Sequence, residues 1–183
     1  DLSYAVTHYK HFWPLSKRFH AGAGLSAKYS FQSKMPYYFT KGLGYSRDFI
    51  RGYEYYVMDG EHFALMKTGI KFTLLPKKEV YASFIPLNKF ATIPFAFYLN
   101  LFSDFGYVSD SQFKETNFLN NSWQYGYGAG IDFVTYYDMI FRLEFSRNKL
   151  GESGFFLHFT SPIQKCTVIR LHENMYLRSS RYR

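Results

Sequence analysis

The sequence predicts an all-β protein of antiparallel strands, and three observations lead to this prediction. Apolar and polar residues alternate with a period of two in segments of about 8 to 15 residues. Helical periodicity is almost absent, and polar turns or turns with glycine or proline separate the segments. The length of 183 residues suits one domain. We therefore expect neighbouring strands that form a β-barrel or a sandwich.

Seven segments carry this alternation. In the clearest one, Tyr125, Tyr127 and Ile131 share one face, while Gly126 and Asp132 lie on the other. The expected strands are residues 4–13, 21–31, 66–75, 93–107, 123–136, 139–146 and 155–160.

The faces opposite the apolar residues carry charge in the middle of strands. In segment 139–146, Arg142 and Glu144 alternate with Leu143 and Phe145. A face with both signs of charge is not expected in a dry core. Two environments would produce such strands: a soluble barrel or sandwich with its apolar face inward, or a membrane barrel with its apolar face toward lipid.

Three features favour the membrane barrel. The segments are long enough for the roughly 9 to 11 tilted residues that cross a bilayer. Phe, Tyr and Leu dominate the apolar faces, and aromatic residues make up 22% of the chain. Aromatic residues also cluster near segment ends, as an interfacial girdle requires: Trp13, Tyr37, Tyr38, Trp123, Tyr136 and Tyr137.

Composition excludes other classes of protein. No stretch approaches the roughly 18 apolar residues of a membrane-spanning helix, and the hydrophobic fraction of 47% is too high for a disordered chain. The net charge is +8, but segment 164–183 alone carries half of it and the remaining bases form no single stripe. We therefore expect no nucleic-acid partner. The single cysteine, Cys166, excludes an internal disulfide.

Residues 32–61 form a long connection without a clean strand, which indicates a functional loop. Its central part reads Gly-Leu-Gly-Tyr-Ser-Arg-Asp-Phe-Ile-Arg-Gly-Tyr over residues 42–53. Residues 102–108 read Phe-Ser-Asp-Phe-Gly-Tyr-Val, and residues 126–132 are rich in glycine.

These motifs, in this order, resemble the bacterial surface-antigen domain, the C-terminal barrel of the BamA/TamA-type outer-membrane assembly superfamily. The resemblance covers about residues 3–163 and implies the C-terminal part of a sixteen-stranded transmembrane β-barrel, about seven strands with a lumenal loop. It implies a bacterial outer-membrane protein that inserts and folds other outer-membrane proteins and is not an enzyme. The implied partners are outer-membrane lipids, client outer-membrane proteins and accessory assembly lipoproteins.

The resemblance also implies that Arg51 of the loop pairs with Asp104. Residue chemistry agrees, because Asp104 is on the polar face of its strand and an arginine fork can hold a carboxylate through two bonds. Gly52 would permit a close turn and Tyr53 would insert as an aromatic wedge. Family members often place a further acid where this chain has Lys71. A second partner for Arg51 must therefore come from elsewhere, with Asp132 and Glu144 as the candidates.

The glycines of residues 126–130 have two compatible interpretations, either strand bends or space for the returning loop. The histidines suggest no metal site, since His8 and His11 lie three apart in a strand and face opposite sides. No cofactor motif is present in the sequence, and we expect none to bind.

Segment 164–183 is basic and follows the last family-like strand, so the sequence leaves open whether it is part of the barrel domain. The chain begins without a start signal, and we expect a processed chain or a piece of a longer one. Three alternative functions remain. They are a self-standing outer-membrane barrel of about eight strands, the barrel anchor of a patatin-like lipase fusion, and a soluble lipid-binding barrel with inward-facing phenylalanines, namely Phe95, Phe97, Phe141 and Phe145.

Overall fold

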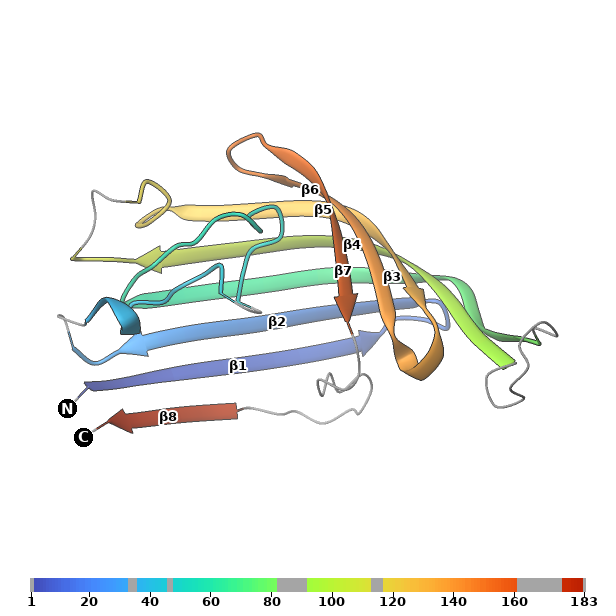
Figure 1. Cartoon of the computed structure of the whole chain (residues 1–183), viewed down its shortest axis with the longest axis horizontal. Coiled ribbons are helices and arrows are strands. Elements are labelled where there is room, and N and C mark those ends of the chain that lie inside the picture. Colours follow the sequence, from blue (N-terminus) through green and yellow to red (C-terminus); the bar gives the residue numbers. More distant parts are fainter. Residues whose placement is uncertain are drawn as a thin grey trace.

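A computed structural model describes residues 2–32, 36–45, 48–81, 92–112, 117–160 and 176–182. These residues form an all-β fold with almost no helix (Figure 1). The strands are β1 (Leu2–Pro14), β2 (Phe19–Ser30), β3 (His62–Tyr81), β4 (Thr92–Ser109), β5 (Trp123–Val134), β6 (Ile140–Asn148), β7 (Ser153–Thr160) and β8 (Tyr176–Tyr182). Two short 3₁₀ turns, η1 (Tyr37–Phe39) and η2 (Tyr136–Asp138), complete the described elements.

All strands belong to one antiparallel sheet in the order β7-β6-β5-β4-β3-β2-β1-β8. The predicted antiparallel all-β class is confirmed, and β1 to β7 correspond to the seven expected strands. Residues 176–182 of the basic C-terminal segment, for which no strand was expected, add β8 beside β1. Strand β7 is paired only with β6 among the described strands, so the sheet is not closed as a barrel.

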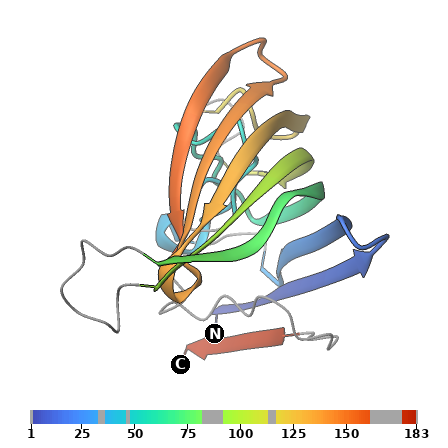
Figure 2. The same cartoon turned by 90° about the vertical axis from the view of Figure 1, so that its right-hand side faces the viewer.

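Strand β3 is much longer than the expected segment 66–75. Its pairing with β4 shifts register after Thr73 and again after Leu75, and strands with such bulges bend. The bulges also interrupt the period-two pattern from which strand ends are inferred. Figure 2 shows how strongly the sheet twists, with the connection between β2 and β3 against one side of it.

The sheet has two different faces. We define the apolar face as the one that carries Leu101, Phe105 and Phe145, which are 53%, 44% and 44% exposed. On this face, neighbouring strands bring phenylalanines into one row that runs through Phe97, Phe133, Phe141 and Phe159, with ring centroids 4.9 to 6.1 Å apart. These rings therefore stay outside the buried part of the molecule.

The opposite face, defined here as the loop face, carries the charged mid-strand residues and is covered by the connection between β2 and β3. Asp104, Asp132 and Glu144 are each at most 1% exposed. The hydrophobic core lies on this same side, where loop residues pack on the ends of β3 and β4. Its members are Leu43, Ile50, Tyr53, Met58, Phe63, Leu65, Val108 and Leu119. The loop thus provides half of the core, which the alternation within the strands could not indicate.

Candidate functional site

The loop turns over the sheet at Arg51 and Gly52. The N–H of Tyr53 donates to the carbonyl of Ile50 at 3.0 Å and closes this turn. Gly52 has a φ of 94°, in the left-handed region that glycine adopts without steric cost. Ile50 and Tyr53 are both 1% exposed and fasten the turn to the core, so the Arg51 side chain is directed at the sheet.

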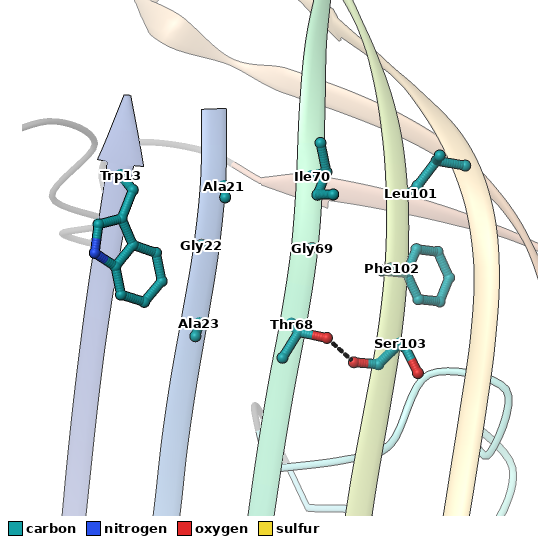
Figure 3. Close-up of a pocket in the computed structure, with 10 residues that line it drawn as sticks. All are labelled: Trp13, Ala21, Gly22, Ala23, Thr68, Gly69, Ile70, Leu101, Phe102 and Ser103. Carbon is teal, nitrogen blue, oxygen red and sulfur yellow. Dashed lines mark hydrogen bonds between the residues drawn. The ribbon is translucent and has the colours of Figure 1, made fainter. Parts of the chain in front are cut away.

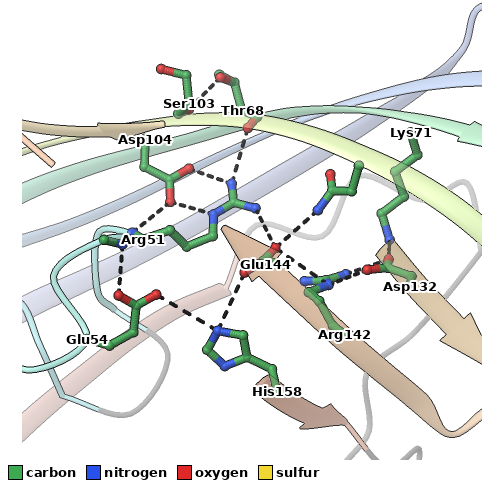
Figure 4. Close-up of polar contacts among 12 residues, drawn as sticks. Arg51, Glu54, Thr68, Lys71, Ser103, Asp104, Asp132, Arg142, Glu144 and His158 are labelled. Atoms are coloured by element: carbon green, nitrogen blue, oxygen red, sulfur yellow. Dashed lines mark hydrogen bonds and ion pairs between the residues drawn. The ribbon is translucent and has the colours of Figure 1, made fainter. Parts of the chain in front are cut away.

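Arg51 binds Asp104 through two nitrogens on one edge of its guanidinium group (Figure 4). Nε lies 2.8 Å from Oδ2 and Nη2 lies 2.6 Å from Oδ1, while the Arg51 backbone N–H also donates to Oδ2 at 3.2 Å. Asp104 is fully buried, and Nη2 also donates to the carbonyl of Thr68 at 3.2 Å. The guanidinium carbon stacks 3.8 Å above the ring of Phe102.

Glu144 is the second acid near Arg51. Its Oε1 lies 3.6 Å from Arg51 Nη1, and the same oxygen accepts a hydrogen bond from Asn100 at 3.2 Å. Glu144 is 1% exposed, so this charge has little solvation by water and depends on its neighbours. Of the two candidates for a further partner, the structure therefore brings Glu144 to Arg51.

Asp132 has different partners. Its Oδ2 accepts from Lys71 Nζ at 2.6 Å, and Arg142 donates to Oδ1 and Oδ2 at 2.6 and 2.9 Å. Arg142 also lies 3.7 Å from Glu144, so the two groups of ions are continuous. Lys71 therefore neutralises Asp132 and does not face Arg51.

A third group joins the loop to β7, and sequence reasoning did not identify it. His158 Nε2 lies 3.5 Å from Glu144 Oε2 and 3.9 Å from Glu54 Oε1. Both His158 Nε2 and Glu54 Oε1 are buried and make no hydrogen bond with any described residue. Burial raises the pKa of the Glu54 carboxyl above its usual range, although its other oxygen accepts from the Gly52 N–H at 2.8 Å.

Tyr53 fills the space beside the turn. It is 1% exposed, and its hydroxyl donates to Gln124 Oε1 on β5 at 2.9 Å. Burial raises the pKa of Tyr53 to about 12, so the hydroxyl stays a hydrogen-bond donor at neutral pH. The Gly52 carbonyl accepts from Asn148 at 3.0 Å, which ties the same turn to β6.

Gly126 leaves space for the loop backbone. A Cβ atom at this position would overlap with the carbonyl oxygen of Arg51, and Ile50 lies close on the same side. Gly128 and Gly130 have a different neighbourhood, since a Cβ there would meet atoms of β6 such as the carbonyl of Phe145 and the side chain of Glu144. The interpretation as space for the returning loop therefore applies to Gly126.

The site is a network of ion pairs and hydrogen bonds between the loop and the sheet. Each acid on the loop face that faces Arg51 or Lys71 is in contact with a cation or an amide. Among the described residues, no group of three or more His, Cys, Asp or Glu side chains could hold a metal ion. Cys166 lies outside the described residues. The network joins the loop to β3, β4, β5, β6 and β7.

The apolar face has a shallow hollow of about 400 Å³ across β1 to β4 (Figure 3). Small residues such as Ala21, Ala23 and Gly69 form it, with Trp13 and Leu101 among the larger residues beside them. It lies on the opposite side of the sheet from most of the ion network and contains no charged side chain. Two of its lining residues, Thr68 and Phe102, also contact Arg51, so the hollow borders the site around Arg51.

Comparisons with protein-family models, with curated proteins and with solved structures gave no match. No helix in the described part of the chain is long and apolar enough to span a membrane.

Proposed function

We propose that this chain is part of the transmembrane barrel of a BamA/TamA-type outer-membrane assembly factor, which inserts and folds other outer-membrane proteins without covalent catalysis. The observation that carries the proposal is the pairing of Arg51 with Asp104. Both residues belong to the two sequence motifs of the resemblance, they are 53 positions apart, and they meet through a two-bond fork. The loop that carries Arg51 also lies against the polar face, as a lumenal loop would.

The apolar face supports a position in a lipid bilayer. Strands β1 to β5 contain 12 to 20 residues, more than the roughly 9 to 11 tilted residues that cross a bilayer. Trp13 and Trp123 are 45% and 63% exposed on this face, near opposite ends of their strands. Such exposed aromatic residues are typical of the two membrane interfaces.

The open sheet supports the proposal that this chain is part of a larger barrel, for which the resemblance implies about sixteen strands. An unpaired strand edge is costly in lipid because its backbone N–H and C=O groups find no water. Strand β7 has such an edge among the described strands. Further strands of the proposed barrel would satisfy these groups. The partners proposed with this function are outer-membrane lipids, client outer-membrane proteins and accessory lipoproteins, in the bacterial outer membrane.

The burial pattern argues against a soluble lipid-binding barrel. That alternative requires Phe95, Phe97, Phe141 and Phe145 to point into a shared interior. Phe145 is 44% exposed, and the buried side of the sheet carries Asp104 and Glu144 instead. A self-standing barrel closed between β1 and β7 receives no support either, because β1 pairs with β2 and β8.

Two measurements on the protein in liposomes test the proposal. Lipids brominated on the acyl chain should quench the fluorescence of Trp13 and Trp123, which lie on the apolar face. A denatured client outer-membrane protein should fold faster in liposomes that hold the protein than in empty ones. Arg51→Ala should remove most of this acceleration. Absence of quenching would contradict the membrane position, and absence of acceleration by the unmodified protein would contradict the assembly function.

A further inference from the structure

The loop enters and leaves the sheet through a stem of two arms, which we define as residues 39–43 and 57–61. The arms are paired with each other, since Leu43 and Met58 exchange two backbone hydrogen bonds of 2.8 Å. The Gly60 N–H also donates to the Thr40 carbonyl at 2.6 Å. Leu43 and Met58 are at most 1% exposed, so the stem is part of the core that carries Ile50 and the turn at Arg51.

The second arm is held by the edges of the sheet. Ser30 Oγ donates to the Glu61 carbonyl at 2.6 Å, and the Glu61 N–H donates to the Ser109 carbonyl at 2.9 Å. Asn120 Nδ2 donates to the Asp59 carbonyl at 2.6 Å. Three contacts from β2, β4 and the turn after β4 therefore determine where this arm lies.

The first arm is bound by one lysine of the sheet. Lys28, near the end of β2, is 6% exposed, and its Nζ donates to the carbonyls of Phe39 at 2.6 Å and Lys41 at 2.7 Å. The carbonyl between them, that of Thr40, is the one that accepts from Gly60. Three successive carbonyl groups thus have donors, and the buried ammonium group has acceptors that offset its desolvation.

We propose that Lys28 is a positioning residue that sets the path of the first arm, and through it the place where Arg51 meets Asp104. The arm has little freedom between these two points, because Leu43 is fully buried and the Gly44 N–H donates to the Asp48 carbonyl at 2.7 Å. Leu43 and Ile50 also belong to one buried cluster, so a displacement at Lys41 is passed through this packing to the turn. The importance of this residue for assembly rests on the proposed function, but its effect on the loop does not.

The best test variant is Lys28→Met, which keeps the length of the side chain and removes its donors. Lys28→Arg is the conservative variant, because it retains a cation with several N–H groups. Lys10→Met is the matched control. Lys10 lies on the loop face of the neighbouring strand β1, opposite Gly24, and is exposed.

Amide hydrogen exchange of the full chain in detergent micelles, read by mass spectrometry, measures each arm separately. We expect Lys28→Met to speed exchange in residues 36–45 by about tenfold or more, since two charge-assisted hydrogen bonds are lost. Residues 57–61 should change little, Lys28→Arg should lie between the two, and Lys10→Met should match the unmodified protein. Lys28→Met should also lower the coupling between Arg51 and Asp104 in a double-mutant cycle.

Two results would overturn the inference. One is unchanged exchange in Lys28→Met, and the other is an equal rise in both arms with no loss of coupling. If Lys28→Met does not fold, acetylation of the unmodified protein decides the matter. Lys28 should then react at least about tenfold more slowly than Lys10, and equal rates would contradict its fixed position. Exchange and acetylation report on the loop alone. Failure of this inference is therefore distinguishable from failure of the proposed function, which would appear as no client folding by the unmodified protein.

Discussion

Arg51 reaches across 53 positions of sequence to hold the fully buried carboxylate of Asp104 through two side-chain nitrogens and its own backbone N–H. The contact fixes a loop to the middle of strand β4, and the stacking on Phe102 leaves the guanidinium plane one orientation. Buried ion pairs add little net stability but are costly to break, because the remaining charge is left without a partner. We therefore regard the pair as a device that determines the position of the loop.

Arg51→Ala should destabilise the fold strongly, because the fully buried carboxylate of Asp104 loses its cationic partner. The expected loss is about 3 to 5 kcal/mol in the free energy of unfolding. Urea unfolding in detergent micelles measures it. Arg147→Ala is a control, since Arg147 is exposed near the end of β6. The double variant Arg51→Asp with Asp104→Arg should recover part of the stability, and equal midpoints for Arg51→Ala and the unmodified protein would refute the role of the pair.

Gly126→Ala should displace the loop without removing any polar contact. The new Cβ would overlap with the Arg51 carbonyl oxygen, and overpacking of this kind costs about 1 to 3 kcal/mol. Gly24→Ala is a matched control on the same face, because its Cβ would meet Lys10 at an ordinary distance of 3.5 Å. Proteolysis of the loop in the folded protein should rise for Gly126→Ala alone. A similar rise in both variants would indicate a general effect of glycine replacement.

The ion pairs around Asp132 should respond unequally to substitution. Asp132→Ala removes the carboxylate that Lys71 and Arg142 share and should cost about 1 to 3 kcal/mol, since both cations are partly exposed and Arg142 keeps Glu144 at 3.7 Å. Lys71→Met should cost roughly 1 kcal/mol or less, because Lys71 is 40% exposed and Arg142 still binds Asp132 through two bonds. The unfolding midpoints of the two variants test this order, and a larger loss for Lys71→Met would contradict it.

Glu54 should make the fold less stable as the pH rises. Burial raises the pKa of this carboxyl in the folded state, so the folded protein keeps a proton that the unfolded chain has released. The contribution of Glu54 to stability is therefore highest below the unfolded pKa of about 4.5 and falls as the pH rises through the higher folded value. Glu54→Gln should remove this fall, stabilising the protein at pH 7 and having little effect at pH 4.

Glu152 should give the opposite pH dependence of stability to that of Glu54. Hydrogen bonds from Asn148 and Tyr56 hold the pKa of its carboxyl below the usual range. Its stabilisation is present above the unfolded pKa and is lost as the pH falls through the folded value. Glu152→Gln should therefore weaken the fold at pH 7 and not at low pH. Thermal unfolding between pH 4 and 8 compares the two variants, and the same pH dependence in both would contradict these assignments.

Several features of the site could be predicted from the sequence because their signals are local or carried by a motif. The alternation around Tyr125 and Tyr127 is sufficient to place Gly126 and Asp132 on one face. The two motifs that contain Arg51 and Asp104 were sufficient to predict that these residues form a pair. The sequence did not, however, identify Asp132 as the partner of Lys71.

The register of the strands explains why this partner could not be predicted from the sequence. Lys71 pairs in register with Asn100, which in turn pairs with Gly130, and Asp132 lies two residues further along β5 on the same face. Gly130 has no side chain, so Lys71 can extend across β4 to a carboxylate 61 positions away. His158 meets Glu54 through the same kind of relationship, between a loop and a strand whose relative position no local pattern encodes.

The sequence by itself determined the strands and their two faces, since a period of two is a property of neighbouring residues. Only the tertiary structure decided that the loop supplies half of the core, that Lys28 holds its first arm, and that β8 pairs with β1. Those features depend on register and on the path of the loop. Both are set by hydrogen bonds and packing between residues far apart in the chain, whose energies the local pattern does not contain.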